Sequence, residues 1–279
     1  MDEHSGFAAK IEPTLVEALA RLAAEAARSI LAIRAGELDV RVKADGSPAT
    51  AADEAAEAII LAGLARILPG IPIVSEEQAG REGYCSAPTF LLVDPLDGTR
   101  EFLAGRDEFT VNIALIVDTR PALGIVAAPA RKRLWSGATG RGAERRTATS
   151  DWEIDTERSA IRTRKWPADA PVALVSRSHL DERTSAFLSR FPGIKTESSG
   201  SALKFCRLAE GTADLYPRLA RTCEWDIAAG HALLAAAGGA VITEQGVPMR
   251  YGQRDSGDCY VPSFIAFADP AIASRVIAT

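Results

Sequence analysis

Residues 91–99, with the sequence Leu91-Leu92-Val93-Asp94-Pro95-Leu96-Asp97-Gly98-Thr99, set the architecture and chemistry that we expect of this chain. The apolar first half predicts a buried strand, and two carboxylates three residues apart follow it. Neighbouring carboxylates repel each other, and a hard divalent cation such as Mg²⁺ relieves that repulsion because it prefers oxygen ligands. We therefore expect a sheet with a metal site at this strand end. A plain tight turn is the alternative, since Asp, Pro and Gly are common turn residues.

The turn after this strand offers two further kinds of contact. Pro95 leaves the carbonyl oxygen of Leu96 free to point at the same ion. The amides of Gly98 and Thr99 would open a helix, and a helix N-terminus is a ready site for an anion. We therefore expect a metal and a phosphate to share one corner of the molecule.

Two other acidic stretches accompany this motif. Glu76 and Glu77 end an apolar run at 71–75, 18 residues before Asp94, and Glu76 would face the same cation or orient a water. Asp226 precedes a helix-like run rich in small residues. A solvated strand end is the plain alternative for the two glutamates, and a helix N-cap is the plain alternative for Asp226.

The rest of the chain alternates between helical and extended patterns. Helices are predicted at 12–35 and from Thr50, where Asp53 completes a capping box, to 68–70. Strands are predicted at 71–75, 89–94, 109–117, 121–128, 172–176, 213–217 and near 240 and 264, and further helices near 181–190, 201–210 and 226–237. This alternation predicts an α/β protein. Residues 141–170 are polar and follow neither period, so we expect a mobile excursion or a lobe boundary there.

Composition narrows the class of protein. The chain has 279 residues, a net charge of −5 and a pI near 5.4, which argues against a nucleic-acid binder held by counterion release. Its first residues lack the order of a signal peptide, and no apolar run reaches the length of a membrane span, so we expect a cytoplasmic protein.

Cysteines at 85, 206, 223 and 259 match no metal or redox spacing, and we expect them to be reduced thiols. With three histidines, any metal must be held by oxygen.

The acidic motifs together carry a family resemblance. Glu76-Glu77, Asp94-Pro95-Leu96-Asp97-Gly98-Thr99 and Trp225-Asp226-x-x-Ala229-Gly230 resemble, in order and spacing, the three signature motifs of the Mg²⁺-dependent, lithium-inhibited inositol monophosphatase superfamily. Residues 175–179, 200–206 and 215–218 resemble the CysQ-type 3′(2′),5′-bisphosphate nucleotidases more than inositol phosphatases. The resemblance covers roughly residues 35–255. It implies a layered α/β/α/β/α sandwich, with an N-terminal lobe over about 1–145 and a C-terminal lobe over about 146–279.

The resemblance also implies roles for individual residues. Two or three Mg²⁺ ions would be bound by Glu76, Asp94, the Leu96 carbonyl, Asp97 and Asp226. Thr99 and Glu76 would orient the attacking water, and Asp53 would hold the Thr99 hydroxyl or a further metal, or act only as a helix cap. The substrate would be bound by Gly98, Thr99, His179, Ser201, Lys204 and Arg218. The plain alternatives are a solvated Lys204, a surface ion pair for Arg218 and an ordinary loop position for His179.

The implied activity is removal of the 3′-phosphate from adenosine 3′,5′-bisphosphate, which gives AMP and phosphate and clears a by-product of sulfate assimilation. 3′-Phosphoadenylyl sulfate is a second expected substrate. The alternatives are a phosphatase of inositol 1-phosphate or fructose 1,6-bisphosphate, and a non-catalytic sensor of bisphosphate nucleotides. Lys204 and Arg218 favour the bisphosphate, since a monophosphate needs no second phosphate site. The sequence leaves open whether the chain is a monomer or a homodimer, and whether it associates peripherally with the inner face of the membrane.

Two stretches depart from the family pattern. Residues 141–170 match nothing in it, so their function stays open. Tyr260-Val261-Pro262 lacks the asparagine that often precedes this proline in related nucleotidases, which leaves base contacts there in question.

Overall fold

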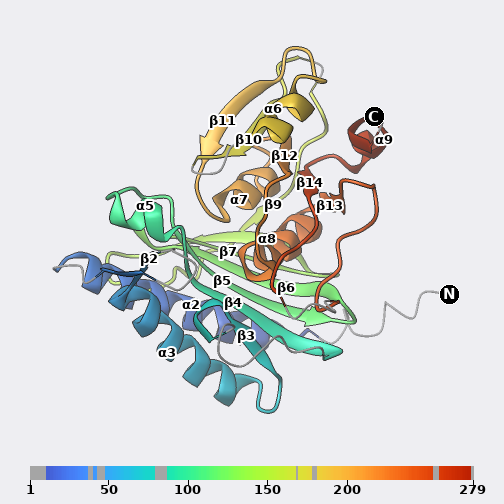
Figure 1. Cartoon of the computed structure of the whole chain (residues 1–279). Coiled ribbons are helices and arrows are strands. Elements are labelled where there is room, and N and C mark those ends of the chain that lie inside the picture. The colour runs from blue at the N-terminus through green and yellow to red at the C-terminus, as the bar shows by residue number, and fades with distance from the viewer. Residues whose placement is uncertain are drawn as a thin grey trace.

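The computed structural model describes residues 11–36, 40–42, 48–78, 87–167, 169–177, 181–253 and 258–277. These residues form two large sheets and the helices that cover them (Figure 1). No helix among these residues is both long enough and apolar enough to cross a membrane.

The first sheet has seven strands in the order β3-β4-β5-β6-β7-β8-β9. Its strands are β3 (Ile73–Ser75), β4 (Thr89–Asp97), β5 (Thr110–Val117), β6 (Arg120–Ala128), β7 (Arg133–Ala138), β8 (Gly142–Thr147) and β9 (Ser159–Ile161). Strand β3 pairs with β4 in parallel, and the remaining neighbours are antiparallel. The pairing of β4 with β5 is irregular between Asp94 and Asp97, at the end that carries the two carboxylates. Such an irregularity re-aims side chains at a strand end.

The second sheet has five strands in the order β11-β10-β12-β14-β13. Its strands are β10 (Val172–Ser176), β11 (Lys195–Ser199), β12 (Leu215–Arg218), β13 (Ala240–Thr243) and β14 (Phe264–Phe267). Successive residues along these strands belong to two different apolar cores, one on each face of the sheet. Leu174 and Tyr216 face the first sheet, whereas Val175 and Leu215 face the outer side. Both faces of this sheet are therefore covered.

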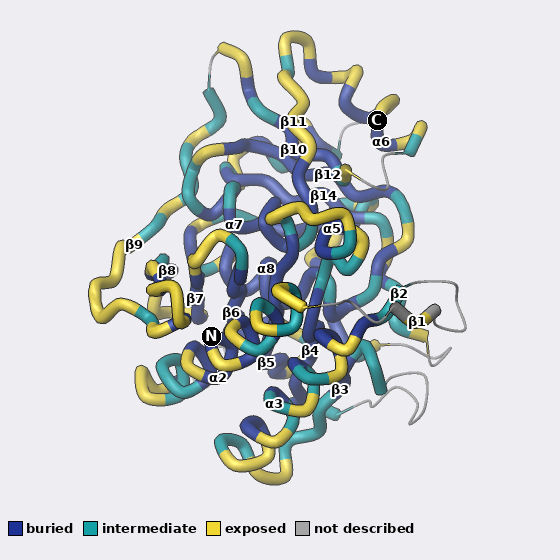
Figure 2. Tube along the Cα trace, turned by 90° about the vertical axis from the view of Figure 1, so that its left-hand side faces the viewer, coloured by how far each residue is buried: buried dark blue, intermediate teal, exposed yellow. Residues whose placement is uncertain are grey.

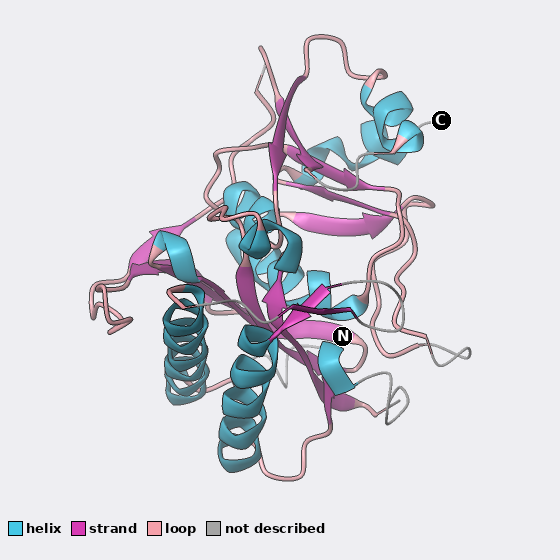
Figure 3. Ribbon diagram, turned by 60° about the vertical axis from the view of Figure 1, so that its left-hand side comes forward, coloured by secondary structure: helices cyan, strands magenta, loops and turns pink. Residues whose placement is uncertain are grey.

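The helices form three layers around the two sheets. α2 (Pro13–Arg34) and α3 (Ala51–Ile67) pack on one face of the first sheet. α7 (Leu203–Ala209) and α8 (Glu224–Ala237) lie between the sheets, where Figure 3 shows a helical layer. α6 (Glu182–Leu188) and α9 (Ala273–Ile277) cover the outer face of the second sheet. The predicted α/β/α/β/α layering is thus confirmed.

Helix α8 shows how this layering shapes the sequence. Most of its residues are buried, and its tube is accordingly dark in Figure 2. A helix with apolar residues on every side belongs in a core rather than on a surface. Small residues such as Ala228 and Ala229 allow it to approach both sheets closely. The start of α8, with Asp226, is therefore held firmly between them.

Shorter elements complete the chain. They are β1 (Val40–Val42), β2 (Pro48–Thr50), α5 (Thr99–Leu103), η1 (Pro129–Arg131) and η2 (Pro270–Ile272). The predicted capping box is present: Thr50 caps α3, and Asp53 accepts from the Thr50 backbone. The predicted helix after Gly98 is also present as α5.

The expectation of a mobile excursion or a lobe boundary over 141–170 is wrong where this stretch forms regular strands. Strands β8 and β9 both fall within it and extend the first sheet. The segment is rich in arginine, and four of these side chains pair with carboxylates: Arg145, Arg146, Arg158 and Arg164. Arg146 is 4% exposed, and its guanidinium donates to Glu17 at 2.6 Å and to the Asp155 carbonyl at 2.7 Å. Charged residues can occupy a strand when partners across the fold satisfy them.

Candidate active site

Three carboxylates from separate parts of the sequence converge at one corner. Glu76 follows β3, Asp94 lies in β4 and Asp226 lies in the first turn of α8. Each offers one oxygen, and these three oxygens lie within 4.8 Å of one another. The parallel register sets Ser75 opposite Val93, so the ends of β3 and β4 coincide. An all-oxygen donor set of this kind fits a hard divalent cation such as Mg²⁺.

The electrostatics of Asp94 and Asp226 also favour a bound cation. Burial, followed by the charges of Glu76, Asp97 and Asp226, raises the pKa of Asp94 well above its usual range. Burial also raises the pKa of Asp226, although hydrogen bonds from Thr222 and from the Cys223 backbone oppose that rise. Carboxylates that repel each other in a buried corner are stabilised in their charged form when a cation joins them.

Asp97 lies beside this group, at the end of β4. Its Oδ2 accepts from the Asn112 side-chain amide at 3.3 Å and from the Thr110 hydroxyl at 3.5 Å, both on the neighbouring strand β5. Burial, and then the charge of Asp226, raises the pKa of Asp97 to about 7, while the charge of Lys204 lowers it. The charges of the acidic corner and of the buried Lys204 therefore act on Asp97 in opposite directions.

Thr99 and Asp53 are in contact, as the sequence predicts. The Thr99 hydroxyl donates to Asp53 Oδ1 at 3.3 Å or to the Leu96 carbonyl at 3.2 Å. The other oxygen of Asp53, Oδ2, accepts from the backbone and the hydroxyl of Thr50, each at 2.7 Å. Asp53 thus caps α3 with one oxygen and contacts Thr99 with the other, so the two interpretations of Asp53 are compatible.

Lys204 and Arg218, the two cations that are predicted to bind a second phosphate, are both buried. The alternatives of a solvated Lys204 and a surface ion pair for Arg218 are therefore wrong. Lys204 is 4% exposed and donates from Nζ to the carbonyls of Ser201 at 2.7 Å and Ser199 at 3.1 Å. Burial lowers its pKa to about 8, and the charge of Asp97 opposes that fall. Arg218 is 9% exposed and donates to the Arg221 carbonyl at 3.2 Å. Neither is a solvated surface residue.

The structure describes one of two further predicted substrate-binding residues, Ser201, but not the other, His179. Ser201 has a φ of +46°, which is uncommon for serine, and its hydroxyl is buried with no hydrogen-bond partner in the part of the chain that the structure describes. A buried, unpartnered hydroxyl of this kind is available to a ligand. His179 lies outside the described residues, so its predicted role remains an expectation from the sequence.

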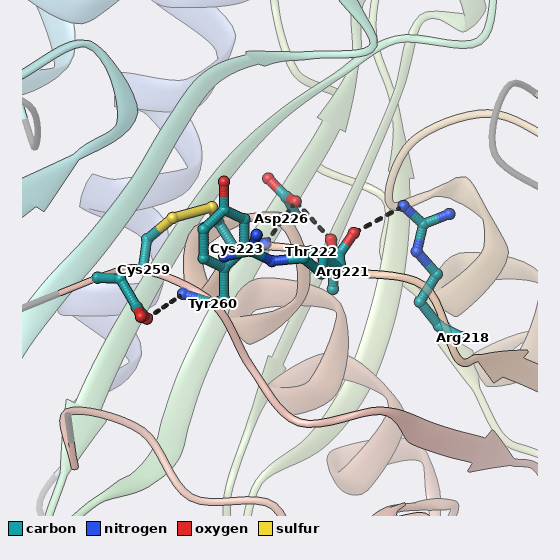
Figure 4. Close-up of a disulfide and its surroundings, with 8 residues drawn as sticks. Arg218, Arg221, Thr222, Cys223, Asp226, Cys259 and Tyr260 are labelled. Carbon is teal, nitrogen blue, oxygen red and sulfur yellow. Dashed lines mark hydrogen bonds between the residues drawn. A yellow bond between two sulfur atoms is a disulfide. The ribbon is translucent and has the colours of Figure 1, made fainter. Parts of the chain in front are cut away.

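A disulfide joins Cys223 to Cys259 beside the acidic corner (Figure 4), and the expectation of four reduced thiols is wrong for this pair. Cys223 immediately precedes α8, and its backbone amide donates to Asp226 Oδ2 at 3.0 Å. The Glu224 amide donates to the Cys259 carbonyl at 2.8 Å, so the two cysteines lie on paired backbone segments. Their 36-residue separation gives no local signal, because tertiary contacts bring them together.

The sequence interpretation missed side chains that support the predicted ligands. The Thr222 hydroxyl donates to Asp226 Oδ2 at 2.5 Å, and Asn112 donates to Asp97. Asn112 is fully buried in strand β5, whose residues other than Asn112 and Thr110 are apolar. A single amide inside an apolar strand is the signal that would have indicated it, since buried polar groups need partners. Trp225 and His231 are also buried, and His231 Nδ1 lies 2.9 Å from the Tyr251 hydroxyl.

Known proteins share this sequence pattern and this geometry. The family model described as the inositol monophosphatase family matches residues 12–266. The 3′(2′),5′-bisphosphate nucleotidase CysQ of Escherichia coli strain K12 is 42% identical over 247 residues, which cover 87% of this chain and 96% of that protein. The crystal structure of CysQ from Bacteroides thetaiotaomicron superposes with a TM-score of 0.76 at 34% identity, over 92% of this chain and 98% of that one.

A more distant structure shares the fold alone. It is the inositol monophosphatase from Anabaena, with a TM-score of 0.74 at 24% identity over 95% of this chain and 94% of that one. The acidic corner, the layered fold and the matches over most of the chain agree, and this chain belongs to the inositol monophosphatase family.

Proposed function

We propose that this chain is a Mg²⁺-dependent 3′(2′),5′-bisphosphate nucleotidase that converts adenosine 3′,5′-bisphosphate into AMP and phosphate. One observation carries the substrate class: two buried cations lie close to the acidic corner. The charge of Lys204 lowers the pKa of Asp97, and the charges of Arg218 and Lys204 oppose the rise in the pKa of Asp226. A corner for the cleaved phosphate beside two cations for a retained phosphate suits a bisphosphate. The CysQ protein of Escherichia coli carries this activity in its name.

The proposed metal ligands are Glu76, Asp94, the Leu96 carbonyl, Asp97 and Asp226, for two or three ions. When bound, Mg²⁺ would neutralise the phosphate and supply a water of lowered pKa. Thr99 would orient that water together with Glu76. Because the Thr99 hydroxyl donates its proton to Asp53 or to Leu96, its oxygen lone pairs are left to accept a hydrogen bond from the water. The water would attack phosphorus directly, so no residue of the chain is phosphorylated.

The remaining substrate contacts follow from the same arrangement. Lys204 and Arg218 would hold the 5′-phosphate, and the buried hydroxyl of Ser201 would complete that pocket. Gly98 and His179 are the other proposed contacts. The same pocket would accept 3′-phosphoadenylyl sulfate, whose 5′ side also carries negative charge, and a role in sulfate assimilation follows from these two substrates.

The test is phosphate release from adenosine 3′,5′-bisphosphate, inositol 1-phosphate and fructose 1,6-bisphosphate, side by side, with Mg²⁺ and with Mg²⁺ plus lithium. We expect strong preference for the nucleotide and inhibition by lithium. Preference for a sugar phosphate would keep the metal ligands but discard the roles of Ser201, Lys204 and Arg218. No release from any substrate would favour the non-catalytic sensor.

A further inference from the structure

Glu108 lies between the metal-binding loop and the segment that leads into α7. A Cβ added to Gly98 would lie 2.9 Å from the Glu108 carbonyl oxygen. A Cβ added to Gly200 would lie 2.7 Å from the same oxygen and 2.9 Å from Glu108 Cβ. Both glycines are therefore needed for this close approach. Through this one residue, the loop with Asp97 and the segment with Lys204 are packed against each other.

The side chain of Glu108 binds the second segment directly. Its Oε2 accepts from Arg177 Nε at 2.7 Å and from the Gly200 amide at 3.1 Å, and its Oε1 accepts from Arg177 Nη2 at 3.1 Å. Arg177 in turn donates to the Ser198 carbonyl at 3.1 Å. The Glu108 carboxylate is 15% exposed, and such bidentate, partly buried contacts are among the stronger protein hydrogen bonds.

Lys204 binds the same segment. Its ammonium donates to the carbonyls of Ser199 and Ser201, while Glu108 and Arg177 bind Gly200 and Ser198. Backbone groups of four consecutive residues are therefore bound by three charged side chains. A shift of this segment away from Glu108 would move the ammonium of Lys204 relative to Asp97.

We propose that Glu108, with Arg177, is a positioning residue that sets the distance between the metal-binding carboxylates and the cations that hold the retained phosphate. The ribose limits the range of spacings between the two phosphates of such a substrate, so this distance determines how well a bisphosphate is accepted relative to a monophosphate. The inference rests on the proposed second phosphate site at Lys204 and Arg218.

The decisive comparison is kcat/KM for adenosine 3′,5′-bisphosphate and for adenosine 3′-monophosphate, measured on the full chain with Mg²⁺. Glu108→Gln keeps the shape but removes the charge that binds Arg177 and, more weakly, Arg131 at 3.5 Å. We expect kcat/KM for the bisphosphate to fall about tenfold, mostly through KM, as for a lost hydrogen bond to a charged group. The value of kcat/KM for adenosine 3′-monophosphate should change less than about twofold, since this substrate needs no second phosphate site.

Two further variants sharpen the comparison. Glu197→Gln is the matched control, because Glu197 pairs with Arg207 at 2.6 Å within the C-terminal part of the chain and makes no contact to the metal loop that the structure describes. It should leave both substrates unchanged. Arg177→Gln and the double variant with Glu108→Gln should each lose about as much as Glu108→Gln alone, because the pair acts as one unit.

The outcomes separate this inference from the proposed function. Equal losses on both substrates, with a lowered Tm, would make Glu108 merely structural and overturn the inference. If Lys204→Met, which keeps the apolar stem, leaves the preference for bisphosphate intact, the second phosphate site itself is wrong. If Lys204→Met removes the preference and Glu108→Gln does not, the second phosphate site stands and the role of Glu108 is rejected.

Discussion

The Thr99 hydroxyl lies 3.3 Å from Asp53 Oδ1, although the two residues are 46 positions apart in the chain. The contact joins the first turn of α3 to the first turn of α5, and Asp53 is only 2% exposed. A buried carboxylate that accepts from three donors around two threonines is held in one orientation. Its orientation fixes where the Thr99 hydroxyl points, which is what a water-orienting role requires.

Thr99→Val should separate this role from the capping role of Asp53. The change removes the hydroxyl but leaves the bonds between Asp53 and Thr50 intact. We expect kcat to fall by about a hundredfold, as for a misplaced reactant, with little change in Tm. Thr99→Ser, which keeps the hydroxyl, is the control and should retain most of kcat. Asp53→Asn should lose activity and also about 1 kcal/mol of stability through the cap. If steady-state kinetics show that kcat of Thr99→Val is close to the wild-type value, the water-orienting role of Thr99 is wrong.

Asp94→Asn tests the metal assignment. Asp94 is 1% exposed, and its pKa is raised by burial and by neighbouring acids, so a neutral amide removes repulsion from the metal-free protein. We expect turnover to fall at least about a hundredfold through lost metal stabilisation of the transition state. Thermal unfolding should show that Mg²⁺ raises the Tm of the wild type but not of the variant. Glu153→Gln, the same chemical change at an exposed position, is the control. A variant that keeps most of its activity would reject the assignment.

The parts of the fold and site that could be predicted are those whose sequence pattern lies within a few neighbouring residues. Strand β4 and the start of α3 could be predicted because apolar runs and a capping box lie within a few residues. Glu76 and Asp94 could be related because each ends an apolar strand-like run, whereas Asp226, a plain helix cap by itself, joined them through the family resemblance. The Cys223–Cys259 disulfide, the buried Arg146 in β8 and the bond from Thr222 to Asp226 all depend on tertiary contacts. No local pattern in the sequence encodes such contacts.

Lys204→Ala and Arg218→Ala should impair the two substrate classes unequally. Each change removes one buried cation from the proposed pocket. We expect kcat/KM for adenosine 3′,5′-bisphosphate to fall at least about tenfold more than that for adenosine 3′-monophosphate, as for a lost charged hydrogen bond. Circular dichroism on both variants checks that the fold persists. Equal losses on the two substrates would remove the proposed role of these cations.

The Cys223–Cys259 disulfide should contribute to stability. It closes a separation of 36 residues, and the chain-entropy estimate for such a loop is about 4 kcal/mol. Denaturant unfolding of the Cys223→Ala/Cys259→Ala variant should show a loss of this order. A thiol reductant should lower the free energy of unfolding of the wild type to that of the double variant. The same reductant should leave the free energy of unfolding of the double variant unchanged, which serves as the internal control. A double variant as stable as the wild type would reject the contribution.

His231 should make stability fall on mild acidification. Burial lowers its pKa to about 3, whereas the unfolded chain has the ordinary value of 6.5. Below about pH 6.5 the unfolded state therefore binds a proton that the folded state does not. The free energy of unfolding falls with a limiting slope of about 1.4 kcal/mol per pH unit, or about 2 kcal/mol between pH 7 and pH 5.

Urea unfolding at pH 7 and pH 5 measures this loss. His231→Asn keeps a polar atom near the Tyr251 hydroxyl but cannot titrate, so about 2 kcal/mol of the pH dependence should disappear in that variant. Tyr251→Phe is the control: it removes the hydroxyl but leaves His231 buried, and because burial is the cause of the lowered pKa, the slope should remain. If the wild type and His231→Asn lose stability in parallel, His231 is not the group that titrates.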